Sequence, residues 1–133
     1  MLEVYLFSLI WEVRSDKYSL DNLCKENGIK AKVWKKGDRI SSKRNHTTFG
    51  FKYFVGEFLT IYELNHGISK FLTENRKNLV SVQSKGCSSE IDIGVTVDVK
   101  AVAVVSLSMP VELQLPLSEL GVITTFTVML SDD

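Results

Sequence analysis

The chain opens with an apolar segment in which both phases of a two-residue alternation are hydrophobic. Such a segment is typical of a β-strand covered on both faces, so we predict a strand over Leu2 to Val13. A polar turn follows, and then Leu20, Leu23 and Cys24 recur at helical spacing. These residues predict a short helix with Ser19 as its N-cap.

Two more strands are expected on either side of a basic loop. Ala31 to Trp34 has the composition of a short strand, and it ends in a Lys-Lys-Gly-Asp turn where Gly37 permits a tight reversal. Residues 41–46 are polar and basic without periodicity, so we predict a mobile loop there. Aromatic and β-branched residues dominate Thr47 to Val55, which we predict as a strand.

The clearest helix begins after Thr60. Thr60 and Glu63 have the spacing of a capping box, in which side-chain oxygens accept hydrogen bonds from free N–H groups of the first turn. Only Gly67 disfavours this helix, because a glycine in a helix interior costs roughly 1 kcal/mol relative to alanine. The apolar side chains that define its buried stripe are Ile61, Leu64, Ile68, Phe71 and Leu72.

The last third of the chain is less regular. Alternation over Ile91 to Val99 predicts a strand with one face open to solvent. Val102 to Leu107 is apolar on both faces and predicts a further strand, although one long bent strand fits the same residues. Ser108 and Pro110 can start a helix, but Pro116 would then break its middle. We therefore predict a helix over Pro116 to Leu120 and leave open whether residues 110–120 form one helix.

A closing strand over Val122 to Leu130 completes the order strand, helix, strand, strand, helix, strand, strand, helix, strand. These elements bury the most surface in an α+β fold, with two to three helices packed on one face of a largely antiparallel mixed sheet. A chain of 133 residues, 44% of them hydrophobic, fits a single domain over 1–133. Such a domain forms its core without a metal or a disulfide.

Cysteine spacing and the chain start bear on cofactors and location. Cys24 and Cys87 are far apart and belong to no metal-ligand cluster, so we expect two reduced thiols rather than a disulfide or a reactive thiol, with no metal and no cofactor. The apolar start lacks a basic leading region and carries Glu3 and Glu12, unlike a signal peptide. No charge-free apolar run reaches about 18 residues, so we expect a cytoplasmic protein without membrane contact.

The formal net charge is zero, but the charges are unevenly distributed. Seven basic residues and a single acid, Asp38, lie between Lys30 and Arg44, whereas the chain from Tyr53 onward holds five basic and ten acidic residues. The molecule is therefore expected to be dipolar, with a basic segment that binds an acidic partner. The candidate site residues are Trp34, Lys35, Lys36, Asp38, Arg39, Lys43 and Arg44.

Two features of this segment also have simpler interpretations. The basic side chains can serve only to keep a loop soluble. Trp34, flanked by lysines, can hold a planar or anionic ligand, but a tryptophan at a strand end also packs against the core. A structure that shows Trp34 buried or lining a cleft distinguishes these interpretations.

An alternative function comes from the aromatic strands. Thr48 to Phe54 resembles the aromatic octapeptide of the RNA-recognition domain, and the apolar first strand resembles its shorter partner motif. The resemblance implies that single-stranded nucleic acid stacks on exposed rings of Tyr5, Phe49 and Phe51. The octapeptide lacks its basic-glycine opening, however, and Lys52 replaces the usual valine, so nucleic acid is not the expected partner.

Enzymatic activity is the third hypothesis and has no motif behind it. The sequence contains no nucleophile elbow, P-loop, dinucleotide fingerprint or H-E-x-x-H segment, so we assign no catalytic residue. His46 and His66 have no acidic partner near them in sequence and are expected to be exposed. Glu90, Asp92 and Asp98 alternate along one strand, which a solvated face explains without a bound cation.

Several segments together resemble a bacterial family of domains of unknown function, family 4279. They are the apolar first strand, Glu26 to Lys32, the turn from Val33 to Asp38, the helix from Tyr62 to Leu72, the strand at Ser89 to Ile93, and Leu117 to Val122. The resemblance spans nearly the whole chain in the family's order. Its most specific part is the Asn-Gly-Ile segment followed by the Trp-Lys-Lys-Gly-Asp turn. It implies a bacterial, single-domain α+β protein with no assigned activity.

Two departures from that family bear on the site. Members often carry tryptophan at the position of Phe49 or Phe51, and Pro116 interrupts what would be their last helix, so a site shaped by that helix does not carry over. Our leading hypothesis is a small bacterial cytoplasmic binding protein that contacts an acidic partner protein through the basic segment and Trp34. An immunity-type protein, which neutralises its partner by surface complementarity, is the specific form of that hypothesis.

Overall fold

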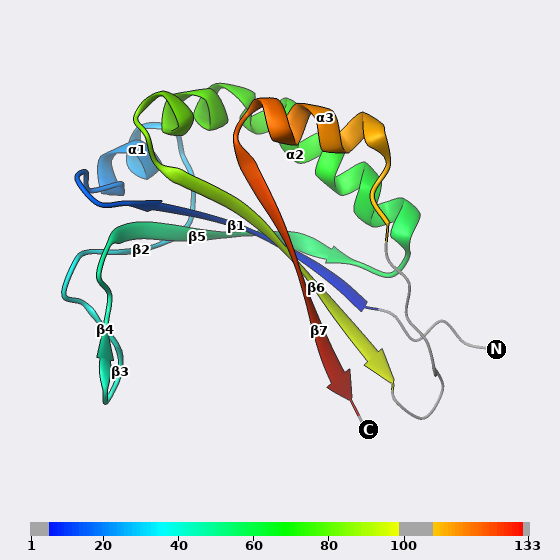
Figure 1. Cartoon of the computed structure of the whole chain (residues 1–133), viewed down its shortest axis with the longest axis horizontal. Helices are drawn as coiled ribbons and strands as arrows, with labels where there is room; N and C mark the ends of the chain where they lie inside the picture. Colours follow the sequence, from blue (N-terminus) through cyan, green and yellow to red (C-terminus); the bar gives the residue numbers. More distant parts are fainter. Residues whose placement is uncertain (1–5, 99–107, 132–133) are drawn as a thin grey trace.

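The structure, a computed structural model, describes residues 6–98 and 108–131. The strands of its main sheet are β1 (Leu6–Ser15), β2 (Lys32–Trp34), β5 (Phe49–Phe58), β6 (Ser88–Asp98) and β7 (Val122–Ser131). Their spatial order is β2-β5-β1-β6-β7. The first four strands pair antiparallel with their neighbours, and β7 runs parallel to β6 at one edge (Figure 1).

The helices of the described residues are α1 (Asp21–Glu26), α2 (Ile61–Ser84) and α3 (Val111–Glu119). α2 packs against β5, β1 and β6, and α3 packs against α2 and β7. Both lie on one face of the sheet, whereas a small hairpin of β3 (Arg39–Ser41) and β4 (Arg44–Asn45) projects to the other side (Figure 1). The predicted fold class is confirmed: an α+β fold whose mixed sheet is mostly antiparallel, with helices on one face.

Alternate residues of the central strands face the helices and form the core. The buried residues on this face of the sheet include Phe7, Leu9, Trp11 and Val13 of β1 and Ile91, Ile93 and Val95 of β6. The opposite face of β1 is only half-buried at Leu6, Ser8 and Ile10. The prediction that β1 is covered on both faces therefore holds at Glu12, which is buried, but not at these other described positions of the second face, because α2 and α3 lie on one side.

The capping box predicted for α2 is confirmed. Thr60 Oγ1 accepts a hydrogen bond from the backbone N–H of Glu63 at 3.1 Å, and the Glu63 carboxylate accepts one from the N–H of Leu59 at 3.0 Å. The helix continues well past the predicted stripe to Ser84, because Leu79 and Val82 extend its buried face.

Gly67, the one residue that argued against this helix, is required by packing. It is buried on the inner side of α2, where an added Cβ would lie 2.3 Å from Cζ of Phe58 at the end of β5. The missing side chain therefore lets the helix approach the sheet over the ring of Phe58.

Two predicted helix boundaries are wrong. α3 runs through Pro116 instead of starting there. The proline removes one backbone donor, but Leu113 and Leu117 are both buried four residues apart, so packing holds the turn that contains it. In α1 the N-cap is Leu20, one residue after Ser19, although the Ser19 hydroxyl still accepts a hydrogen bond from the N–H of Asp21 at 3.5 Å. Leu20 is almost fully buried, so its side chain packs into the core as the chain enters the helix.

The basic loop is also more ordered than predicted. Residues 41–46 are not an irregular loop, since Arg39 pairs with Asn45 and Ser41 with Arg44 across the β3–β4 hairpin, whereas the mobility of this segment stays a prediction. The hairpin projects from the sheet and buries no apolar face of its own, which is why its sequence lacks a strand-like alternation. The strand predicted at Val102 to Leu107, and the alternative of one long bent strand, lie outside the described residues.

Both cysteines are free, as predicted. Burial raises the pKa of the Cys24 thiol from 9.0 to about 11, and the carboxylate of Asp21 adds to this shift. At about pH 8.5 we therefore expect iodoacetamide to modify the half-buried Cys87 well before Cys24, whose thiolate fraction is roughly a hundredfold below that of an ordinary thiol.

The same shift gives a test by pH. The unfolded chain loses the Cys24 proton near its ordinary pKa of 9.0 while the folded protein keeps it up to about 11, so stability should fall as the pH rises through this window. Urea denaturation of the wild type and of Cys24→Ala at several pH values isolates the contribution of Cys24, because the other titratable groups are the same in both proteins. Equal pH slopes in the two proteins would show that Cys24 is not protected.

Candidate functional site

A tight turn after β2 fixes the base of the β3–β4 hairpin beside the sheet. Asp38 Oδ2 accepts a hydrogen bond from the Lys35 N–H at 2.8 Å, and Gly37 has a φ of 89°, which a side chain would rarely tolerate. The Gly37 N–H donates to the carbonyl of His46 at 2.8 Å, and the His46 N–H donates to the carbonyl of Asp38 at 2.7 Å. The two ends of the hairpin segment are thus tied together, and His46 is held beside Trp34.

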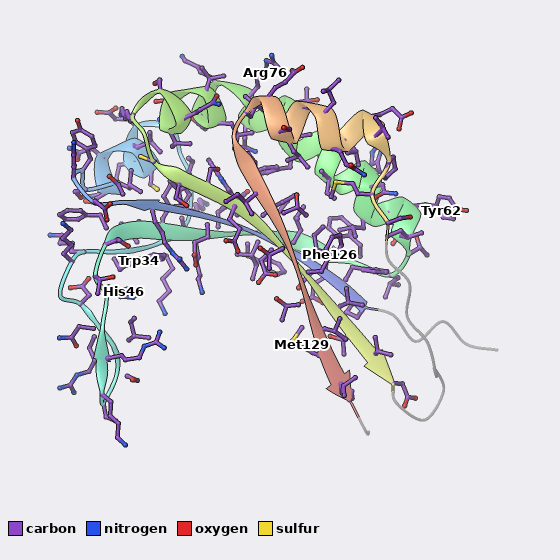
Figure 2. The ribbon with its side chains drawn as sticks, viewed as in Figure 1. Trp34, His46, Tyr62, Arg76, Phe126 and Met129 are labelled. Carbon is purple, nitrogen blue, oxygen red and sulfur yellow. The ribbon has the colours of Figure 1, made fainter. Side chains whose placement is uncertain are left out.

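Trp34 lies on the sheet face opposite the helices. Its ring stacks on that of His46, with centroids 4.5 Å apart and planes 15° from parallel (Figure 2). On its sheet side it fits over Gly50 of β5, where an added Cβ would lie 2.2 Å from Cζ2 of the indole. Trp34 is buried but is not part of the main core, so its burial comes from the hairpin and not from the helices.

A cavity of about 490 Å³ lies at the base of the hairpin, on this same face of the sheet. Its walls come from three sources: β1, the neighbouring strand β5, and the hairpin with its flanking residues. The lining residues are Glu12, Arg14, Trp34, Ile40, Arg44, Asn45, His46, Thr47, Thr48 and Lys52. The Nε1 donor of Trp34 has no hydrogen-bond partner among the described residues.

A buried carboxylate between two cations forms the floor of the cavity. The side chain of Glu12 is 9% exposed and pairs with Lys52 Nζ at 3.4 Å and with the Arg14 guanidinium. Arg14 and Lys52 are 54% and 55% exposed, so each can turn part of its charge toward a ligand. Arg44 of β4 adds a third cation to the wall. The cavity therefore carries more positive than negative charge.

The seven residues predicted from sequence divide into three groups. Trp34 and Arg44 line the cavity. Asp38 shapes the turn. The others are exposed on the turn and the hairpin, outside the cavity: Lys35, Lys36, Arg39 and Lys43.

Sequence reasoning missed Glu12, Arg14 and Lys52. They come from strands far apart in the chain, and only the pairing register places Glu12 opposite Lys52. One sequence signal was available for Glu12: it is a charged residue with large apolar side chains on both sides of it in the strand. A buried carboxylate in that position needs cationic partners. His66 is exposed as predicted, whereas His46 is partly buried against Trp34.

Among the described residues, the rings predicted to stack on nucleic acid do not form an exposed surface. Phe51 is fully buried in the core, edge-on to Trp11 at 5.0 Å between ring centroids. Phe49 is partly buried, with Lys36 Nζ 5.6 Å from its ring centroid, and Tyr5 lies outside the described residues. The prediction of an exposed ring at Phe51 is therefore wrong, because the phase of β5 that carries it faces α2.

The cavity can bind an anionic group through its cations, its threonine hydroxyls and its amide groups. In residues 6–98 and 108–131, no three His, Cys, Asp or Glu side chains gather where they could hold a metal ion. No helix in the same ranges is long and apolar enough to cross a membrane.

Comparison with known proteins adds no assignment to this geometry. No family model, no curated protein and no solved structure matches the chain. The resemblance to family 4279 therefore stays a prediction.

Proposed function

We propose that the protein is a small bacterial cytoplasmic binding protein that contacts an acidic surface of a partner protein. The contact is made by the β3–β4 hairpin and the cavity at its base. The observation that carries the proposal is the arrangement of three cations, Arg14, Arg44 and Lys52, around a single carboxylate in that cavity. An acidic side chain of the partner enters the cavity and shares Arg14 and Lys52 with Glu12.

Exposed charges on the hairpin extend this attraction into solvent. Arg39, Lys43 and Arg44 lie on a hairpin that projects from the sheet, and Lys35 and Lys36 lie on the turn before it (Figure 1). Like charges gathered in this way speed the approach of an oppositely charged protein and fix its orientation. Binding should therefore weaken as salt concentration rises.

A protein partner is favoured over nucleic acid by the acids on the same sheet face. Glu90 lies opposite Glu12 in the register of β1 and β6, and Asp92 lies opposite Ile10. A phosphate backbone crossing this face would meet these carboxylates, whereas a protein can present one acidic patch to the hairpin alone. An immunity-type role, with a toxin as the acidic partner, is the specific form we propose.

Charge reversal on the hairpin tests the proposal. We expect the double variant Lys43→Glu/Arg44→Glu to recover about tenfold less partner than the wild type when each is used to capture proteins from the native host. The matched control is Arg76→Glu/Lys77→Glu, which makes the same charge change at exposed positions on α2 (Arg76 is labelled in Figure 2). Capture is quantified by mass spectrometry at about 50 and about 500 mM NaCl.

Three outcomes would contradict the proposal. The hairpin variant could retain full capture, both double variants could lose it equally, or the wild type could recover only nucleic acid. Loss confined to the hairpin variant, together with release at high salt, would support it.

A further inference from the structure

The edge strand β7 is unusual in composition and exposure. Its ten residues contain no charged residue, no glycine and no proline. Among the described residues, no strand pairs with its outer edge. In the part of the chain that the structure describes, thirteen large hydrophobic side chains are exposed, and seven of them lie on α3 and β7, including Phe126 and Met129 (Figure 2). Unpaired N–H and C=O groups beside exposed apolar side chains form a ready template for another strand.

The opposite edge of the sheet, formed by β2 and the end of β5, has features that prevent pairing with another strand. β2 is three residues long and carries the exposed Lys32. The part of β5 that extends beyond β2 has a bulge at Val55 and the exposed Glu57. Short length, lysine, bulges and charges are the devices by which proteins prevent edge pairing. As far as the described strands go, the sheet therefore has one edge closed to pairing and one edge open.

We propose that two copies of this protein pair through β7, antiparallel about a twofold axis, to form a dimer with a continuous sheet. One open edge per chain closes the assembly at two copies, since each β7 is consumed by the other. The strand that pairs with β7 is the β7 of a second copy, because β7 is uncharged and self-complementary. No like charges meet when it pairs with itself.

The side chains match when the axis passes through Phe126. On the helix side, the register pairs Val122 with Leu130, Thr124 with Val128, and Phe126 with itself. On the other side it pairs Ile123 with Met129 and Thr125 with Thr127. Each pair joins apolar or β-branched residues, which stabilise neighbouring strands. Five side chains that are exposed in one chain become covered: Ile123, Phe126, Val128, Met129 and Leu130.

A groove beside β7 provides further contact area. It has a volume of about 460 Å³ and lies between α3 and β7, with Gln114, Leu117, Thr124 and Phe126 in its walls. Strand pairing alone covers a narrow strip, and stable interfaces typically bury about 800 Å² on each partner. Side chains of the second β7 reach these grooves from the helix side of the sheet and enlarge the interface.

The dimer leaves the proposed partner site free. The hairpin and its cavity lie toward the β2 edge, at the far side of the sheet from β7. In a ten-stranded sheet, the two β2 edges are roughly 40 Å apart at a strand spacing of about 4.8 Å. The inference is independent of the proposed function, because changes on β7 do not touch the hairpin.

Molar mass measured by light scattering during size-exclusion chromatography tests the dimer. We expect the wild type at micromolar concentration to elute at twice the 15.0 kDa chain mass. Val128→Lys should shift it to the single-chain mass, with a dissociation constant raised by about tenfold or more, because it places two lysines in the interface. Val80→Lys on α2 is the matched control, since Val80 and Val128 are 46% and 50% exposed.

Leu130→Lys is a second variant in case Val128→Lys fails to fold. Leu130 is the most exposed residue of the strand, so a lysine there should not disturb the fold of the single chain. A wild type that stays at single-chain mass up to millimolar concentration would overturn the proposal. So would a dimer that survives both β7 variants, or larger open assemblies in place of a dimer.

Hydrogen exchange distinguishes strand pairing from packing of apolar faces. In the dimer the outward amides of residues 122–130 are also hydrogen-bonded, so all nine amides of this range should be protected. In Val128→Lys, alternate amides of β7 should exchange about tenfold faster or more, while those that bond to β6 stay protected. A dimer whose outward β7 amides exchange freely would show that its contact is not the strand edge.

Discussion

Trp11→Ala is expected to lower the free energy of unfolding by about 3–5 kcal/mol. The indole is fully buried in the centre of the sheet, edge-on to Phe51 at 5.0 Å and to Phe71 at 5.3 Å. Its Nε1–H donates to Ser89 Oγ at 2.9 Å. Alanine loses the ring, leaves a cavity between the sheet and α2, and deprives a buried hydroxyl of its partner. Urea denaturation followed by circular dichroism measures the loss.

Such a loss is a large part of the roughly 5–15 kcal/mol that stabilises a domain, so a milder set of variants keeps the test informative. Trp11→Phe retains an aromatic ring and loses the hydrogen bond, and Ser89→Ala leaves the indole donor unpaired. With the double variant they form a cycle with an expected coupling of about 1 kcal/mol. A cost below about 1 kcal/mol for Trp11→Ala would contradict the central position of this ring.

The elements that the sequence predicts best are those whose signal is local. The capping box at Thr60 and Glu63 is a contact over three residues, and it starts α2 where expected. The alternation of apolar and polar residues over Ile91 to Val97 likewise predicts the strand face that is buried under the helices. Both depend on spacing along a single element, so no knowledge of the rest of the fold is needed.

The errors arise where tertiary contacts override local preference. Pro116 disfavours a helix interior, but the burial of Leu113 and Leu117 keeps α3 continuous through it. The β3–β4 hairpin shows the reverse case, because its pairing leaves no trace in the polarity of residues 41–46. Neither outcome follows from the residues of the element alone.

The candidate site could be predicted only in part. Trp34 and Arg44 belong to the basic segment that the sequence identifies, and both line the cavity. The cavity also needs Glu12 and Lys52, which the β1–β5 register brings together from positions forty residues apart. Register depends on the pairing of whole strands, which a single sequence read along its length does not reveal.

Gly50→Ala is expected to lower the free energy of unfolding by about 1–3 kcal/mol and to displace Trp34 from the site. The added Cβ would lie 2.2 Å and 2.5 Å from two carbons of the indole and 2.7 Å from the carbonyl oxygen of Val13. The strand backbone of β1 has little room to move, so the indole must move instead, and its stack on His46 is lost. The two indole N–H resonances, from Trp11 and Trp34, report this directly by NMR.

Gly94→Ala is the matched control, because its Cβ would meet the hydroxyl of Ser8 and the terminal carbon of Met129, both of which can rotate away. We expect it to cost less than about 1 kcal/mol and to leave the Trp34 resonance unchanged. In a Trp34→Ala background, Gly50→Ala should lose only the part of its cost that comes from the indole, because the 2.7 Å contact with the Val13 carbonyl oxygen remains. A Gly50→Ala protein with wild-type stability and an unshifted Trp34 resonance would show that the indole does not lie over Gly50, and would remove one wall of the proposed binding cavity.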